Sequence, residues 1–191
     1  MNKYFLVITL ILSSVIHIST ASTIVTADSI KHKDKKTSVF PILPSNVSRL
    51  FYIQRDPNAN TIVYELNING SGQLDLEQPV HAYWIRYNDK GQHEELGYIQ
   101  RKFAYGLIQQ AIGNGKYDIR FVSYKKIQFI LMKGTDLKYH IYTTIAHKQA
   151  ILNRIFVKIE GGSFWIPNVV YVELRGTDPA TGQEIVDRFK P

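Results

Sequence analysis

The sequence predicts an all-β domain whose antiparallel strands form a meander that closes into a barrel or a half-barrel. After residue 45, short runs of β-branched and aromatic residues recur at regular spacing. Asn, Asp and Gly separate these runs, and the connections are too short for the crossover that parallel neighbours need. With 191 residues, 45% of them hydrophobic, the chain suits one folded domain. The alternative is an immunoglobulin-like β-sandwich, because short strands can also form two packed sheets.

Residues 1–21 have the pattern of a secretory signal peptide. Lys3 precedes an uncharged apolar run over 4–18, and small residues at 19 and 21 offer a cleavage site after Ala21. The apolar run is shorter than the roughly 20 residues of a membrane-spanning helix. We therefore expect Sec-type export to the periplasm or the extracellular space, with no transmembrane span after signal cleavage.

Residues 22–45 are polar and basic and end in a Pro-Ile-Leu-Pro sequence, which predicts a basic flexible linker. A single β-rich domain over 46–191 follows it. Ten strands are expected, at 49–55, 61–68, 80–87, 95–100, 117–123, 127–132, 138–146, 150–160, 169–175 and 184–189. Apolar residues spaced three and four apart predict one short helix over 101–112, although Gly106 in its middle disfavours it.

Composition excludes several classes of function. Removal of the signal peptide takes away one lysine and no acid, so the net charge falls from +7 to +6. The basic residues form no clustered stripe, and we expect no nucleic-acid partner. The chain has no cysteine, which excludes disulfides, thiolate metal sites and a cysteine nucleophile. The histidines lack metal-ligand spacing and no cofactor motif is present, so we expect no metal and no cofactor.

A repeated motif supplies the candidate ligand-binding residues. Tyr-Ile-Gln-Arg occurs at 52–55 and at 98–101, and Tyr-Trp-Ile-Arg occurs at 83–86. Because side chains alternate along a strand, Arg55, Arg86 and Arg101 would each end an apolar stripe. Their planar guanidinium groups suit carboxylate or phosphate, and the indole rings of Trp84 and Trp165 would form an apolar wall. The alternative is that each arginine lays its stem on apolar surface with its charge in water.

Four segments carry a resemblance to a known family: 50–56, 81–84, 98–106 and the terminal 176–182. On these residues the chain resembles the exported bacterial proteins called domain of unknown function 4833, over about 46–191. The resemblance implies a small exported Gram-negative domain, and it carries over no catalytic or ligand-binding residue.

The favoured hypothesis is a non-catalytic envelope domain that binds a small anionic or amphipathic ligand or another envelope component. A hydrolase of envelope glycan is an alternative, because it needs only a pair of carboxylates. Glu65, Glu94, Glu95, Glu173 and Asp178 are available for such a pair. A structural or protein-interaction module that docks a partner on a sheet edge is the third possibility.

Overall fold

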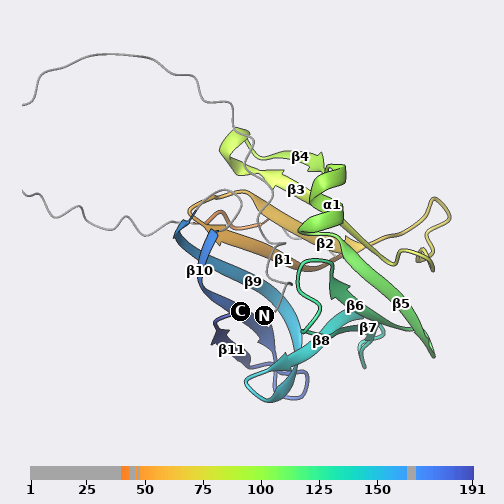
Figure 1. The fold of residues 1–191 in the computed structure, drawn as a ribbon. Helices are drawn as coiled ribbons and strands as arrows, with labels where there is room; N and C mark the ends of the chain where they lie inside the picture. Colours follow the sequence, from red (N-terminus) through yellow and green to blue (C-terminus); the bar gives the residue numbers. More distant parts are fainter. Residues whose placement is uncertain (1–39, 44–45, 47, 163–166) are drawn as a thin grey trace, which may run out of the picture.

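A computed structural model describes residues 40–43, 46, 48–162 and 167–191 (Figure 1). Over these residues the chain is all-β, with eleven strands, one α-helix and one turn of 3-10 helix. The predicted signal peptide at 1–21 and Trp165 lie outside the described residues, as does most of the predicted linker at 22–45.

The two short helical elements are α1 (Tyr98–Phe103) and η1 (Tyr87–Asp89). The strands, in chain order, are β1 (Arg49–Asp56), β2 (Thr61–Leu66), β3 (Val80–Arg86), β4 (Gln92–Glu95), β5 (Leu107–Gly113), β6 (Lys116–Phe121), β7 (Phe129–Lys133), β8 (Tyr139–Ile145), β9 (Lys148–Gly162), β10 (Pro167–Thr177) and β11 (Glu184–Phe189).

Two antiparallel meanders make up most of the sheet. One contains β1 to β4 and the other β5 to β9, and nine strands follow each other in the order β4-β3-β2-β1-β9-β8-β7-β6-β5. Strands joined by short connections are antiparallel, as predicted, whereas the meanders meet in a parallel pair, β1 with β9. The sheet curls into an open half-barrel, which confirms the predicted fold class.

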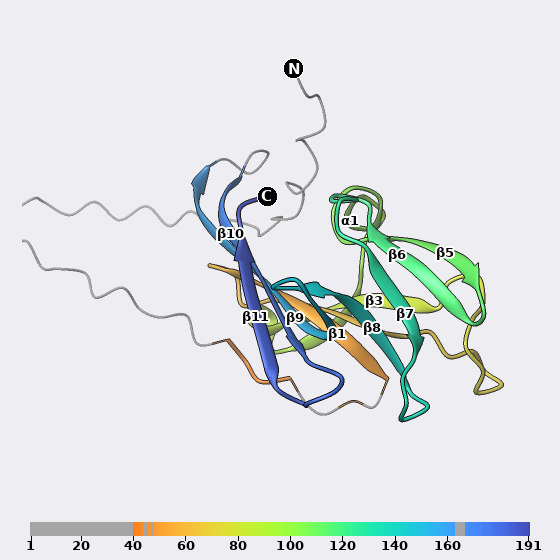
Figure 2. The ribbon, with the colours of Figure 1, turned by 90° about the horizontal axis from the view of Figure 1, so that it is seen from below.

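The long strand β9 is the common support of the fold. Near its start it pairs with β8, and along its middle it pairs with β1. Its remaining neighbour is β10, which continues the sheet to β11. Two arms therefore diverge from β9, and Figure 2 shows β10 and β11 on one side with β5, β6 and β7 on the other. The sheet is continuous, so the two-sheet sandwich is not the arrangement found.

Aromatic side chains fill the space between the two meanders. Phe51 of β1 stacks on Tyr64 of β2 with ring centroids 4.4 Å apart. Phe121 of β6 meets both rings edge-on and also contacts Phe129 of β7. These four side chains are buried and join the two meanders in one core.

Two predictions around α1 were wrong. Residues 98–100 of the predicted strand at 95–100 lie in α1, and the predicted helix at 101–112 ends at Phe103, because 107–113 forms β5. The reason is a tight turn at Gly106, where an added Cβ atom would lie 1.8 Å from the backbone oxygen of Arg101. This close approach folds the chain back and separates helix from strand.

Candidate functional site

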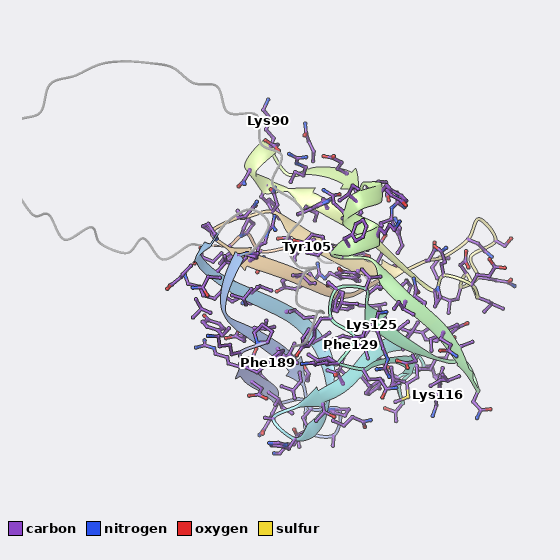
Figure 3. All side chains as sticks on the ribbon, in the orientation of Figure 1. Lys90, Tyr105, Lys116, Lys125, Phe129 and Phe189 are labelled. Atoms are coloured by element: carbon purple, nitrogen blue, oxygen red, sulfur yellow. The ribbon has the colours of Figure 1, made fainter. Side chains whose placement is uncertain are left out.

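A half-open apolar cleft of ≈ 90 Å³ lies between the two arms. One wall is the inner face of β1, β9, β10 and β11, and the other is formed by β6, β7, the loop between them and the segment after α1. We call it the apolar cleft, and its lining residues are Ile53, Ala104, Tyr105, Phe121, Ser123, Tyr124, Ile127, Phe129, Ile155, Val157, Val172, Leu174, Phe189 and Pro191. Figure 3 labels Tyr105, Phe129 and Phe189.

Strand register explains the first wall. Val157, Val172 and Phe189 are direct neighbours across β9, β10 and β11, so they form one row of the cleft. Ile155 and Leu174 form the next row. Directly paired residues point to the same side of a sheet, and residues two apart on a strand share that side. The apolar alternation of β9 and β10 thus gives the cleft a continuous aliphatic wall.

The segment 104–106 is fixed between the arms by three hydrogen bonds. The hydroxyl of Ser123 donates to the carbonyl of Ala104 at 2.6 Å, and the hydroxyl of Tyr64 donates to that of Tyr105 at 2.9 Å. The amide of Val122 donates to the carbonyl of Gly106 at 3.0 Å. The ring of Tyr105 is therefore held in place as part of the second wall.

A buried cation lies behind this wall. The guanidinium carbon of Arg55 is 5.7 Å from the centre of the Trp84 ring and 5.9 Å from that of Tyr105. The indole Nε1 of Trp84 donates to Oε1 of Gln100 in α1 at 2.9 Å, which fixes the ring. Burial raises the pKa of Tyr105, and the nearby positive charge of Arg55 opposes that rise. We call Arg55, Trp84 and Tyr105 the Arg55 cluster.

The structure brings together only part of the predicted anion site. Arg55 and Trp84 are in contact. Arg86 forms ion pairs with Asp89 at 2.7 Å and Glu94 at 3.0 Å. Burial lowers its pKa, but the hydrogen bonds to these carboxylates outweigh burial and raise it. Arg101 is exposed on α1, so the three arginines do not converge on one pocket. Ligand binding by Arg55, Arg86, Arg101, Trp84 and Trp165 stays a prediction.

The five candidate carboxylates are engaged in local contacts. Glu65 and Glu95 both approach His81, and Glu94 pairs with Arg86. Glu173 pairs with two arginines, and Asp178 accepts hydrogen bonds from the turn before β11. None of the five lines the apolar cleft.

The residues that line the apolar cleft were not among the site residues predicted from the sequence. Tyr105 was not among the predicted site residues, and the helix predicted over 101–112 included it, whereas it lies in the connection between α1 and β5. Val172 and Leu174 alternate within a predicted strand, so their shared face could have been read from the pattern. The contact of Phe189 with that face depends on the register of β11, for which the sequence holds no local signal.

In the described part of the chain, no three His, Asp or Glu side chains are grouped so that they could hold a metal ion. No helix in that part has the length and apolar character needed to cross a membrane.

A comparison with models of known protein families identifies the family of this chain. The model of the family described as "Domain of unknown function (DUF4833)" matches residues 51–188.

The chain belongs to the DUF4833 family. The matched residues run from β1 to β11, so the apolar cleft and the Arg55 cluster lie almost entirely within the DUF4833 match. The segments that carried the resemblance form β1, part of β3, α1 with its following turn, and the connection before β11. No curated protein and no solved structure was found to match this DUF4833 chain.

Proposed function

We propose that this domain is a non-catalytic binding protein of the bacterial envelope that holds the apolar part of an anionic or amphipathic ligand in the apolar cleft. The observation that carries the proposal is the cleft itself. It is half-open, and side chains from both arms give it an almost wholly apolar lining. Transfer of apolar ligand surface from water into such a cleft is favourable, by about 25 cal/mol per Å². Export is supported by the leader pattern of residues 1–21.

Positive charge near the cleft favours an anionic ligand. Arg55 lies against the ring of Tyr105, which lines the cleft. Lys125 and Lys126 are exposed in the loop that contributes Ser123, Tyr124 and Ile127 to the lining. An alkyl chain inside the cleft would therefore leave its anionic end in a region of positive potential.

Substitution of Val172 by Phe tests the proposal. Val172 is in the middle of the aliphatic wall, so V172F fills the cleft. Dodecanoate should bind the unmodified protein in isothermal titration calorimetry, and V172F should weaken that binding at least tenfold. Dodecyltrimethylammonium, which has the same chain and the opposite charge, should bind the unmodified protein more weakly than dodecanoate does.

The matched control is V186F. Val186 is in the same β10–β11 hairpin but pairs with Arg175 on the opposite face, away from the cleft. It should leave dodecanoate binding unchanged. Equal binding by V172F and V186F, or no binding of dodecanoate by the unmodified protein, would refute the assignment of the cleft.

A further inference from the structure

The opposite face of β1 and β9 carries a second cavity. Alternation along β1 places Ile53 and Arg55 toward the core, and Tyr52 and Gln54 on the outer face. A cavity of ≈ 400 Å³ lies on that outer face, within the usual size range of small-molecule sites. We call it the outer pocket, and its lining residues are Phe40, Pro41, Ile42, Leu43, Arg49, Tyr52, Gln54 and Arg154.

Arg154 is the distinctive residue of the outer pocket. Its guanidinium carbon is 5.0 Å from the ring centre of Phe156 and 5.7 Å from that of Phe40. The Nε atom is buried and has no hydrogen-bond partner among the described residues. In the described part of the chain no carboxylate forms an ion pair with Arg154. Arg154 is therefore a half-buried cation whose guanidinium lies against two aromatic rings.

Neighbouring cations on the same face already have carboxylate partners. Arg175, which pairs with Arg154 across β9 and β10, contacts Glu173 and Glu184. Lys158 of β9 contacts Asp56 and Glu160. The carboxylates near Arg154 thus pair with Arg175 and Lys158 and not with Arg154. An anion from outside the chain could neutralise the charge of Arg154.

The remaining walls provide further ligand contacts. Gln54 is buried, and its Nε2 atom lies 3.4 Å from the carbonyl oxygen of Pro41, which ties segment 40–43 to the sheet. Arg49 lies over the ring of Tyr52, with 5.8 Å from its guanidinium carbon to the ring centre. Two guanidinium groups therefore line the pocket together with apolar side chains, and the lining contains no acidic residue.

We propose that the outer pocket binds a small molecule with an oxyanion, a carboxylate or a phosphate, on an apolar or aromatic body. Arg154 receives the oxyanion, because its planar fork donates two parallel hydrogen bonds to such groups. The apolar body lies against Phe40, Ile42 and Leu43. This site is separate from the apolar cleft, since the two occupy opposite faces of β1 and β9.

Calorimetry with three small probes tests the outer pocket. Phenyl phosphate and phenylacetate carry the two oxyanions, and benzyl alcohol is their uncharged analogue. At least one oxyanion probe should bind the unmodified protein ten times more tightly than benzyl alcohol does, and the tighter one identifies the oxyanion. Arg154→Gln should weaken that binding at least tenfold. Arg154→Lys should also weaken it, because lysine keeps the charge and loses the planar fork.

Lys116→Gln is the control for net charge. Lys116 is exposed at the start of β6, and its loss removes the same single charge without altering the pocket. It should bind the probes as the unmodified protein does. Near-ultraviolet circular dichroism establishes that each variant is folded, and Arg154→Lys provides the readout if Arg154→Gln does not fold. The proposal is overturned if neither oxyanion binds, or if both Arg154 variants bind them as tightly as Lys116→Gln does.

Discussion

Arg55 and Glu173 are the two charged residues buried in the described part of the molecule. The guanidinium of Arg55 lies against two aromatic rings. Such cation–π contacts contribute about 2 kcal/mol when they are desolvated. Glu173 pairs with Arg175 at 3.2 Å and with Arg188 at 2.8 Å. Burial raises the pKa of its carboxyl group, but the hydrogen bonds from Arg188 and Arg175 outweigh burial and lower it.

The lowered pKa of Glu173 makes its contribution to stability depend on pH. The folded state favours the ionised carboxylate, so this contribution is complete above the unfolded pKa of about 4.3 and is lost as pH falls through the folded pKa. E173Q should lower the free energy of unfolding at pH 7 by about 1.5–3 kcal/mol, the range for hydrogen bonds to charged groups. Urea denaturation should show this difference shrinking at acidic pH. E184Q is the control, because Glu184 is exposed and should have a smaller effect. A difference that is constant with pH would contradict the assigned ion pairs.

At the scale of elements, one tetrapeptide adopts two structures. Tyr-Ile-Gln-Arg forms part of β1 at 52–55, yet it opens α1 at 98–101. Arg55 is buried behind the cleft, whereas Arg101 is exposed. The predicted equivalence of these arginines therefore failed, because tertiary packing outweighs the weak local preference of four residues. Most other strands lie where alternation and turn residues predicted them, and the strand at 184–189 has the predicted bounds.

The turn at Gly106 gives a prediction about the junction of α1 and β5. A Cβ atom there would lie 1.8 Å from the backbone oxygen of Arg101, and backbone cannot move aside as a flexible side chain can. G106A should therefore cost at least about 1–3 kcal/mol, the usual range for overpacking, and lower the melting temperature accordingly. G70A is the matched control, because an added Cβ at Gly70 meets no atom within 4 Å. Equal melting temperatures for the two variants would rule out this close approach.

At the scale of the whole molecule, the side chain of Gln109 links the two meanders by joining β5 to β3. Oε1 of Gln109 in β5 accepts a hydrogen bond from the amide of Val80 in β3 at 2.8 Å. Its Nε2 donates to the carbonyl of Val80 at 2.9 Å. The carboxamide thus makes with Val80 the two hydrogen bonds that a paired backbone residue would make. Nothing in the sequence around Gln109 distinguishes it from Gln110. The sequence therefore could not predict which glutamine links the meanders, nor the detailed form of the open barrel.

Removal of this link should loosen the half-barrel. Q109A leaves the buried amide and carbonyl of Val80 without these partners, and an unsatisfied buried polar group costs about 1–3 kcal/mol. We expect chemical denaturation to show a loss of this size, and hydrogen exchange to show faster exchange at the start of β3. The neighbouring Gln110 is exposed, so Q110A should change neither. If Q109A and Q110A behave alike, the side-chain link does not join the meanders.

The parallel pair of β1 and β9 affects how the chain reaches its native state. Tyr52 pairs with Arg154, so one of the central contacts of the sheet joins residues that are distant in sequence. Contacts between residues so far apart in the sequence slow folding. The chain must lose the conformational entropy of a long loop before such a contact can form and stabilise the fold. During synthesis, each meander can assemble from local hairpins, but β1 keeps one edge unpaired until β9 is available. Under the proposed export, late completion of this pair would prolong the interval in which the chain remains unfolded.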